Sequence, residues 1–313
     1  RYRNSKMSAP CAKLTAENVS EFLASVDVVF TDCDGVLWNG PDVIPGAPEA
    51  LKKLREMGKS IYFVTNNSTK SRGEYVKKCQ AMNIQASEEE IIGTAYVAAQ
   101  YLKNVMKYTG KVYMLGQQGV SEELDKAGIR HNPPGPDPVH GSVKDWVDME
   151  LDPEVKCVLV GFDEHVSYMK LMKAVRYLRE VEGCHFIATN TDSVLPMGEG
   201  KVVPGTGVTV SAISTGAGRK PDIIMGKPNP PIFQCVQQMH KIDPARTIMI
   251  GDRLNTDIML GHNCGLRTLL VLTGYSSLQD AQKNMSSNSI EHQKQVPHFY
   301  IDSLGTLGEL LQR

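Results

Sequence analysis

The sequence predicts an α/β fold built on a mostly parallel sheet. Short apolar runs rich in β-branched residues recur along the chain, and each is followed by a turn and then by a stretch with helical spacing of its apolar residues. Runs that are apolar on both faces suit buried parallel strands, because a strand with one face in water alternates apolar and polar residues. Strand and helix alternating along one chain are typical of a parallel sheet covered by helices.

The apolar runs locate the expected strands, and the amphipathic stretches between them locate the expected helices. We expect strands at 26–31, 61–65, 112–115, 155–162, 185–189, 223–226, 247–251 and 268–272, with a last one at 298–302. We expect helices at 47–57, 75–82, 168–178 and 231–240.

Three segments interrupt the alternation. The sequence HNPPGPDP at 131–138 predicts a loop, because proline lacks the N–H that helices and central strands require. The sequence PGTG at 204–207 predicts a hinge or a tight strand-to-helix turn. The polar stretch 276–295 predicts an exposed helix and loop before the last strand.

Length and composition exclude several classes of protein. A chain of 313 residues indicates two domains, or one domain with a large insertion. Its 34 Lys and Arg against 35 Asp and Glu argue against a partner held by bulk charge, so we expect neither nucleic acid nor membrane as a partner. No run of about 18 apolar residues is present that could span a membrane. The seven cysteines form no zinc-like cluster, which indicates reduced thiols and a cytoplasmic location.

The first chemical motif is the sequence VDVVFTDCDGVLW at 26–38. An apolar strand leads into Asp32 and Asp34, and the spacing of two predicts that both carboxylates lie on one side of the strand end. Open α/β sheets place their ligand sites at this end of their strands. Two neighbouring acids repel unless a cation lies between them or one is protonated. A calcium-binding EF-hand loop is excluded, because Leu37 and Val43 occupy the positions that require Gly and Glu.

The second motif is SIYFVTNNST at 60–69. Another buried strand ends in small hydroxyl and amide side chains, and helix-like sequence follows. Thr65, Asn66 and Asn67 can offer hydroxyl, amide and backbone N–H donors at a helix N-terminus, which is a suitable site for phosphate. Capping of the helix by Ser68 or Thr69 is a compatible alternative.

The third and fourth motifs follow two later strands. In IIMGKPNPPIF at 223–233, Lys227 lies between Gly and Pro and is held stiffly enough to neutralise a phosphoryl oxygen. In TIMIGDRLNTDI at 247–258, Asp252 at a strand end is a good ligand for a hard cation such as Mg²⁺. Asp257 could hold the loop or the water shell of a metal, or could favour the N-terminus of a helix.

The four motifs together resemble the haloacid dehalogenase superfamily of phosphatases. The order DxDG, TNNS, GKPxP and GDRxxTD matches that family, from about residue 16 to the C-terminus. The motif sequences DCDGVLW and GDRLNTDI are similar to those of one branch of the family. This branch contains nitrophenylphosphatase-like enzymes, phosphoglycolate phosphatase and pyridoxal phosphatase. The resemblance implies a Rossmann-like parallel-sheet core at 16–107 and 222–313, with an α/β cap domain inserted at 108–221. The distance from Asn67 to Lys227 is independent support, since it is far too long for one crossover.

The resemblance also implies a mechanism. Asp32 would attack phosphorus and form an aspartyl-phosphate, and Asp34 would act as general acid and then as general base, although the residues alone would equally allow these two roles to be exchanged. Mg²⁺ would be held by the Asp32 carboxylate, the Asp34 main-chain oxygen and Asp252, with Asp257 supporting its shell. The phosphate-binding side chains would be those of the second and third motifs, namely Thr65, Asn66, Asn67 and Lys227. A homodimer formed through the cap is a further implication.

The segment TNTDSVLPMGEG at 189–200 resembles the substrate loop of the family. Pyridoxal-phosphate enzymes of this branch carry Trp-His after TNxD, whereas this chain has Ser193, Val194 and Leu195, which offer no stacking plane. We therefore expect a small anionic phosphate ester, such as 2-phosphoglycolate or glycerol 3-phosphate, as substrate. Arg176 or Arg179 could supply contacts to a carboxylate.

Several other functions share these motifs. A phosphatase for pyridoxal 5′-phosphate or for phosphoproteins, and a sugar phosphomutase, would use the same core. A catalytically inactive interaction protein that binds Mg²⁺ is the alternative that is not an enzyme, and the intact Asp34 argues against it.

Overall fold

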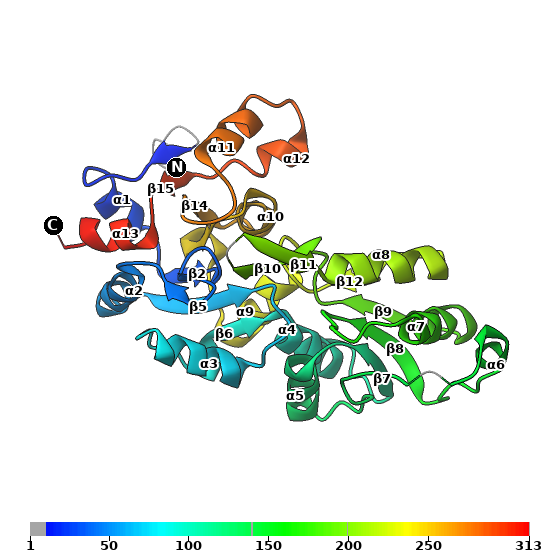
Figure 1. The fold of residues 1–313 in the computed structure, drawn as a ribbon. Coiled ribbons are helices and arrows are strands. Elements are labelled where there is room, and N and C mark those ends of the chain that lie inside the picture. The colour runs from blue at the N-terminus through cyan, green and yellow to red at the C-terminus, as the bar shows by residue number, and fades with distance from the viewer. Residues whose placement is uncertain (1–10, 139, 199, 313) are drawn as a thin grey trace, which may run out of the picture. The chain divides into compact units, whose positions relative to one another are not determined.

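The chain folds into two compact units, described here from a computed structural model that covers residues 11–138, 140–198 and 200–312 (Figure 1). The terminal unit comprises Arg1–Thr65, Val76–Ile92 and Lys227–Arg313, and the inserted unit comprises Asn66–Tyr75 and Gly93–Gly226. The inserted unit contains 108–221 and adds 66–75, 93–107 and 222–226. Both units are built on parallel sheets with helices, which confirms the predicted α/β class.

The main sheet of the structure has seven strands in the order β1-β15-β14-β13-β2-β5-β6. Its strands are β1 (Ala12–Lys13), β2 (Val28–Thr31), β5 (Ser60–Thr65), β6 (Ile91–Gly93), β13 (Thr247–Gly251), β14 (Arg267–Val271) and β15 (Phe299–Ile301). In its centre β2 pairs in parallel with β13 on one side and β5 on the other. Every residue of β2 and β13 is buried, as expected for strands covered on both faces. The carboxyl ends of β2, β5 and β13 therefore meet at one edge.

Helices and one small hairpin complete the terminal unit. They are α1 (Val19–Ala24), β3 (Trp38–Asn39), β4 (Asp42–Val43), α2 (Ala47–Glu56), α3 (Arg72–Ala81, which belongs to this unit from Val76 onward), η1 (Glu88–Glu90), α9 (Pro231–His240), η3 (Pro244–Arg246), η4 (Leu254–Ile258), α10 (Met259–Cys264), α11 (Leu278–Met285), α12 (Ile290–Gln293) and α13 (Leu304–Leu310). Aromatic pairs join helices to the sheet. Phe22 of α1 meets Phe299 edge to face, with ring centroids 5.1 Å apart, and Phe233 of α9 lies 5.7 Å from Phe30 of β2.

The inserted unit has a parallel sheet of its own, in the order β12-β9-β8-β7. Its elements are α4 (Thr94–Gln100), η2 (Tyr101–Val105), β7 (Lys111–Leu115), α5 (Gln118–Ala127), α6 (Val143–Val147), β8 (Val155–Val160), α7 (Tyr168–Glu180), β9 (His185–Ala188), β10 (Val194–Gly198), β11 (Lys201–Pro204), α8 (Thr206–Ala217) and β12 (Ile223–Ile224). Tyr177 of α7 and Ile213 of α8 pack on Val158 and Phe186 of the sheet in one buried cluster.

Each predicted strand overlaps an observed one, but the segment 189–200 is not simply a loop. Its second half forms β10, which pairs antiparallel with β11. The sequence hides this hairpin, because its proline and glycines are unfavourable within strands. The turn at Gly205 is the tight strand-to-helix turn expected there, since β11 ends at Pro204 and α8 begins at Thr206.

Among the described residues, no helix combines the length and apolar character that crossing a membrane requires.

Candidate active site

Asp32 lies directly after the central strand β2. Its backbone N–H donates to the Ile250 carbonyl oxygen of β13 at 2.8 Å, which fixes the chain at the sheet edge. Its Oδ1 accepts a hydrogen bond from the Cys33 N–H at 2.8 Å and lies 2.8 Å from the Lys227 Nζ. The residue is only 8% exposed. Asp32 is therefore a buried, oriented carboxylate with a cationic partner.

Asp34 has a different environment from Asp32, and the strand alternation from which a common side was predicted does not apply to them. The strand ends at Thr31, so its alternation does not extend to either acid. The Asp34 side chain is 48% exposed, and its Oδ1 accepts a hydrogen bond from the Trp38 Nε1 at 2.9 Å. Lys78 lies over the Trp38 ring, 4.2 Å from its centroid, with its Nζ 3.9 Å from the same Oδ1.

The pKa of Asp34 is raised above its ordinary value. Loss of hydration where the side chain meets the protein is the main cause, and the negative charge of Asp32 adds to it. Lys78 and the Trp38 N–H oppose the rise. A half-exposed carboxyl group with a raised pKa is suited to exchange a proton with a bound molecule.

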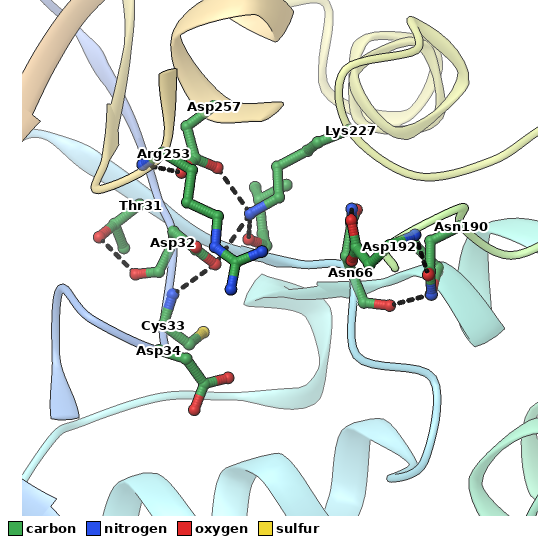
Figure 2. A network of polar contacts seen from close by, with 12 residues as sticks. Thr31, Asp32, Cys33, Asp34, Asn66, Asn190, Asp192, Lys227, Arg253 and Asp257 are labelled. Carbon is green, nitrogen blue, oxygen red and sulfur yellow. Dashed lines mark hydrogen bonds and ion pairs between the residues drawn. The ribbon is translucent and has the colours of Figure 1, made fainter. Parts of the chain in front are cut away.

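The second motif divides between the two units. Thr65 ends β5 in the terminal unit and is 2% exposed. Asn66 belongs to the inserted unit, where its Nδ2 donates to the Asp192 carboxylate at 3.2 Å and its carbonyl oxygen accepts from Asn190 at 2.8 Å (Figure 2). Asn67 accepts hydrogen bonds from the backbone N–H and the hydroxyl of Thr69, at 2.9 and 2.7 Å.

The helix expected at 75–82 is observed as α3, but the second motif does not lie at its N-terminus. Helix α3 starts at Arg72, so Asn66 and Asn67 lie in a loop rather than at a helix N-terminus. Ser68 does not cap the helix, because its hydroxyl accepts a hydrogen bond from the Phe162 N–H at 3.3 Å. Side-chain turns of Asn and Ser compete with helix formation and delay the first turn.

Lys227 is the cationic centre of the terminal unit's site. The residue is 3% exposed, and its Nζ lies 2.8 Å from Asp32, 2.8 Å from Asp257 and 2.9 Å from the Val64 carbonyl oxygen (Figure 2). Burial acts to lower the pKa of Lys227, but the charges of Asp257 and Asp32 outweigh it and the net shift is upward. The side chain is therefore a fixed positive charge between two carboxylates.

Asp252 follows β13 and lies in a narrow space made by two glycines. A Cβ at Gly35 would lie 2.6 Å from the Asp252 Oδ2, and a Cβ at Gly274 would lie 2.1 Å from it. This Oδ2 accepts a hydrogen bond from the Tyr275 N–H at 2.6 Å, whereas the buried Oδ1 has no hydrogen-bond partner among the described residues. Burial, followed by the charges of Asp257 and Asp32, raises the pKa of Asp252 to about 8.

Asp257 lies on the short helix η4 and is fully buried. Its Oδ2 accepts a hydrogen bond from the Arg253 N–H at 3.0 Å, so it holds the loop that carries Asp252. Its Oδ1 is the atom that faces Lys227. Burial raises the pKa of Asp257 to about 6, although Lys227 acts in the opposite direction.

Three carboxylates therefore converge at the edge of the sheet. Oxygens of Asp32, Asp252 and Asp257 all lie within 4.8 Å of one another. When ionised they carry three negative charges, and Lys227 offsets one, which leaves two for a divalent cation to balance. Hard oxygen donors and the unsatisfied Asp252 Oδ1 fit a hard divalent cation, the class to which Mg²⁺ belongs.

Sequence reasoning did not identify Trp38, Lys78, Asn190 and Asp192 as neighbours of motif residues. Trp38 lies four residues after Asp34, and this spacing across a turn is the one signal that pointed to it. The others are brought in by tertiary folding, since 126 residues separate Asn66 from Asp192.

Comparison with known proteins agrees with this geometry. Residues 29–130 match the family model described as haloacid dehalogenase-like hydrolase, and residues 224–307 match a second, HAD-hydrolase-like model. The chain is 45% identical to glycerol-3-phosphate phosphatase of Homo sapiens, with 97% of each chain covered. It is 39% identical to chronophin of Homo sapiens, over 97% of this chain and 99% of that one.

Solved structures give the same result. The 4-nitrophenylphosphatase of Thermotoga maritima is 29% identical, with a TM-score of 0.75 over 92% of this chain and 98% of that one. The p-nitrophenyl phosphatase of Archaeoglobus fulgidus is also 29% identical, with a TM-score of 0.76 over 91% of this chain and 98% of that one. By sequence, fold and the carboxylates at its strand ends, this chain belongs to the haloacid dehalogenase-like hydrolases.

Proposed function

We propose that the protein is a Mg²⁺-dependent phosphatase that hydrolyses small phosphate monoesters, 2-phosphoglycolate and glycerol 3-phosphate foremost. The observation that carries the proposal is the convergence of Asp32, Asp252 and Asp257 around Lys227. Full-length similarity to glycerol-3-phosphate phosphatases supports the substrate class.

The cation would be held by the Asp32 carboxylate, the main-chain oxygen of Asp34 and Asp252. When bound, Mg²⁺ supplies charge neutralisation for the phosphoryl oxygens. The Asp252 Oδ1 is available for such a bond, because no described residue hydrogen-bonds to it. Asp257 supports the arrangement by fixing the Arg253 N–H and facing Lys227.

In the first half-reaction the Asp32 carboxylate attacks phosphorus, and the bond from phosphorus to the ester oxygen breaks. Asp34 donates its proton to that oxygen, so the alcohol leaves neutral and Asp32 becomes an aspartyl-phosphate. A carboxylate is a suitable nucleophile here, since it needs no base to activate it. The raised pKa of Asp34 favours the protonated form that this step uses.

In the second half-reaction a water molecule attacks phosphorus. Asp34, now ionised, takes a proton from this water, and the bond between phosphorus and Asp32 breaks to release inorganic phosphate. We propose that Thr65, Asn66, Asn67 and Lys227 hold the phosphoryl oxygens during both steps. Lys227 has its charge fixed for that purpose by Asp32 and Asp257.

We propose that residues 16–107 and 222–313 are the catalytic core and that residues 108–221, a cap domain, select the substrate. The segment 189–200 supports this role, since Asp192 holds Asn66 of the phosphate-binding motif. Ser193, Val194 and Leu195 lack the aromatic plane that a pyridine ring would stack on. The alternatives are a pyridoxal 5′-phosphate phosphatase and a phosphoprotein phosphatase, which differ from this proposal in the substrate that they hydrolyse fastest.

The test measures phosphate release from 2-phosphoglycolate, glycerol 3-phosphate, pyridoxal 5′-phosphate and a phosphoserine peptide, with Mg²⁺ or with EDTA. We expect the first two to give the highest kcat/KM and EDTA to abolish turnover. A value for pyridoxal 5′-phosphate about tenfold above both, which corresponds to about 1.4 kcal/mol of transition-state preference, would reverse the substrate assignment.

The nucleophile has its own test. Asp32→Asn keeps the shape of the side chain but loses its nucleophilic charge, so turnover is expected to fall by more than about a thousandfold. Circular dichroism checks that the variant is folded. A folded variant that retains a larger rate would reject the aspartyl-phosphate.

We also propose a cytoplasmic homodimer formed through the inserted unit. All seven cysteines are free thiols, as suits a reducing compartment. Large apolar side chains of the inserted unit are exposed, among them Tyr168 (65%), Met197 (61%) and Val202 (57%). A two-fold pair could cover such side chains on both subunits. Light scattering is expected to give twice the chain mass of 34.5 kDa, and a monomer mass would reject the dimer.

A further inference from the structure

We propose that Arg253 and Tyr275 form a subsite for a second anionic group of the substrate, a carboxylate on the leaving group. The inference rests on the proposed function. It assigns to the terminal unit a preference for phosphate esters of hydroxy acids over phosphate esters of neutral alcohols.

The Arg253 guanidinium is uncommitted. Among the residues that the structure describes, none forms a hydrogen bond or an ion pair with it. It lies over the Tyr275 ring, 4.7 Å from the centroid, and its charge acts at longer range on Asp252. Two other arginines of the terminal unit are paired with carboxylates, Arg55 with Glu90 at 2.6 Å and Arg246 with Asp27. Figure 2 shows the guanidinium pointing toward the carboxylate end of Asp32. Because no described residue hydrogen-bonds to the guanidinium, its five donors are available to a bound anion.

The base of the Arg253 side chain is held in place. Its backbone N–H donates to Asp257 at 3.0 Å, and the preceding residue is Asp252. Two further hydrogen bonds tie this loop to the loop of Tyr275. The Ser276 N–H donates to the Asp252 carbonyl oxygen at 3.0 Å, and the Leu254 N–H donates to the Ser276 Oγ at 3.2 Å.

The aromatic side chain of Tyr275 does not contribute to the buried core, so its presence is not explained by packing. The residue is 71% exposed, yet its backbone N–H is fixed on the Asp252 Oδ2 at 2.6 Å. A ring stacked on a guanidinium orients the plane of the cation and leaves its N–H edges open. Those edges match the two oxygens of a carboxylate.

The position of the pair favours the leaving group over the transferring phosphoryl group. Lys227, at 3% exposure, lies at the buried floor of the site with Asp32. Arg253 is half-buried and stacks on an exposed ring, so it lies at the rim. The part of a small ester that lies at the rim is the alcohol, and in 2-phosphoglycolate that alcohol carries a carboxylate.

The experiment compares kcat/KM for 2-phosphoglycolate with that for glycerol 3-phosphate, which has a neutral alcohol. In Arg253→Gln we expect a loss of about 10- to 100-fold for 2-phosphoglycolate, mainly through KM, and less than about threefold for glycerol 3-phosphate. Tyr275→Leu should reduce the ratio of kcat/KM for 2-phosphoglycolate to kcat/KM for glycerol 3-phosphate by about threefold. Tyr275→Phe keeps the stacking plane and should restore it. An equal loss on both esters, or no loss on either, would overturn the subsite.

A binding measurement separates this inference from the proposed function. Calorimetry with Asp32→Asn protein in Mg²⁺ measures Kd for both esters without turnover, with and without the added Arg253→Gln substitution. Selective weakening of 2-phosphoglycolate binding would support the subsite even if the unsubstituted enzyme released no phosphate, a result that would reject the proposed function alone. Equal weakening of both esters would reject the subsite while leaving the phosphatase activity in place.

Discussion

At the scale of single residues, Lys227 sets the electrostatics of the site. Its ammonium group is the shared partner of Asp32 and Asp257, whose carboxylates would otherwise repel each other in a buried place. A buried cation between two acids stabilises the fold only while all three groups are present, because removing one leaves charges without a partner. The same lysine therefore has a structural role besides the catalytic role that we propose.

Lys227→Met should lower the free energy of unfolding by about 3 kcal/mol in metal-free buffer, since it leaves two buried acids uncompensated. Urea denaturation measures the change. Lys170→Met is a matched control, because it breaks another buried pair, with Asp163 at 2.6 Å, in the inserted unit. Both variants should lose stability, and only Lys227→Met should change the response to Mg²⁺. If Lys170→Met altered the Mg²⁺ response as strongly as Lys227→Met, the assignment of Lys227 to the metal-binding site would be contradicted.

At the scale of elements, the site depends on loops that hold one another closely. The loop after β13 carries Asp252, and the loop after β14 brings Gly274 and the Tyr275 N–H against its carboxylate. Each of these loops is short and follows a buried strand. The carboxylate fits between these loops because neither glycine carries a Cβ, which would overlap the Asp252 Oδ2 from either position.

Gly274→Ala tests this arrangement. The added Cβ would lie 2.1 Å from the Asp252 Oδ2, so the carboxylate must move. We expect the Mg²⁺ concentration that gives half-maximal activity to rise about tenfold or more. Gly216→Ala is the control, because the atoms nearest to its Cβ all belong to the Val175 side chain in the inserted unit, the closest at 2.7 Å. An unchanged Mg²⁺ requirement in Gly274→Ala would show that Asp252 is not a ligand.

A second element-scale prediction concerns His298, which precedes β15. Its ring stacks on His262, with centroids 5.0 Å apart, and its Nδ1 lies 2.8 Å from the Thr268 hydroxyl. Burial, followed by the nearby His262 and Arg267, lowers the pKa of His298 from 6.5 to about 4. Between pH 6.5 and pH 4, His298 of the unfolded chain binds a proton that His298 of the folded protein does not bind. The stability contributed by the neutral ring is therefore complete above pH 6.5 and is lost as the pH falls toward 4.

Urea denaturation at pH 7 and pH 5 measures this effect. The wild-type protein should lose on the order of 1 kcal/mol more between the two than His298→Asn does, once solvent screening of the partly exposed ring is considered. An identical pH dependence in the two proteins would show that the ring is protonated in the folded state.

At the scale of the whole molecule, the acidic site links folding to pH and to metal. The pKa of Asp252 is raised to about 8, so the folded, metal-free protein holds a proton there that the unfolded chain releases near pH 4. Stability from this protonated group is present at low pH and is lost as the pH rises through about 8. A cation bound at Asp252, as we propose, would take over the role of the proton.

Thermal unfolding over a grid of pH and Mg²⁺ tests this linkage. Without metal, the free energy of unfolding should fall between pH 6 and pH 8. Mg²⁺ at about 100 times its Kd should add about 2.7 kcal/mol. The apparent affinity should be higher at pH 8, because no proton must be displaced there. Asp252→Asn should remove both effects, and a Mg²⁺ response that persisted in this variant would contradict the site.

The sequence allowed the sheet and the acidic cluster to be predicted, for one physical reason. Buried parallel strands are continuous apolar runs, and the ends of neighbouring strands meet, so the sequence indicated that Asp32 and Asp252 lie together. The position of Lys227 does not follow from this rule, because the strand before it, β12, belongs to the sheet of the inserted unit. The hairpin β10–β11 could not be predicted, because its strands are short and contain Pro and Gly. The contact of Asn66 with Asp192, and the stack of Arg253 on Tyr275, depend on loop conformations that no periodicity encodes.

The half-exposed side chain of Asp34 has a consequence for isotope experiments. Its Oδ1 is anchored by Trp38, which leaves Oδ2 as the oxygen that carries the proton in the role that we propose. With 48% of the side chain open to water, this proton equilibrates with the solvent between one turnover and the next. An isotope label on the Asp34 carboxyl proton would exchange with water before it could be transferred to the next leaving alcohol. In the role that we propose, Asp34 therefore exchanges its proton directly with the bulk solvent.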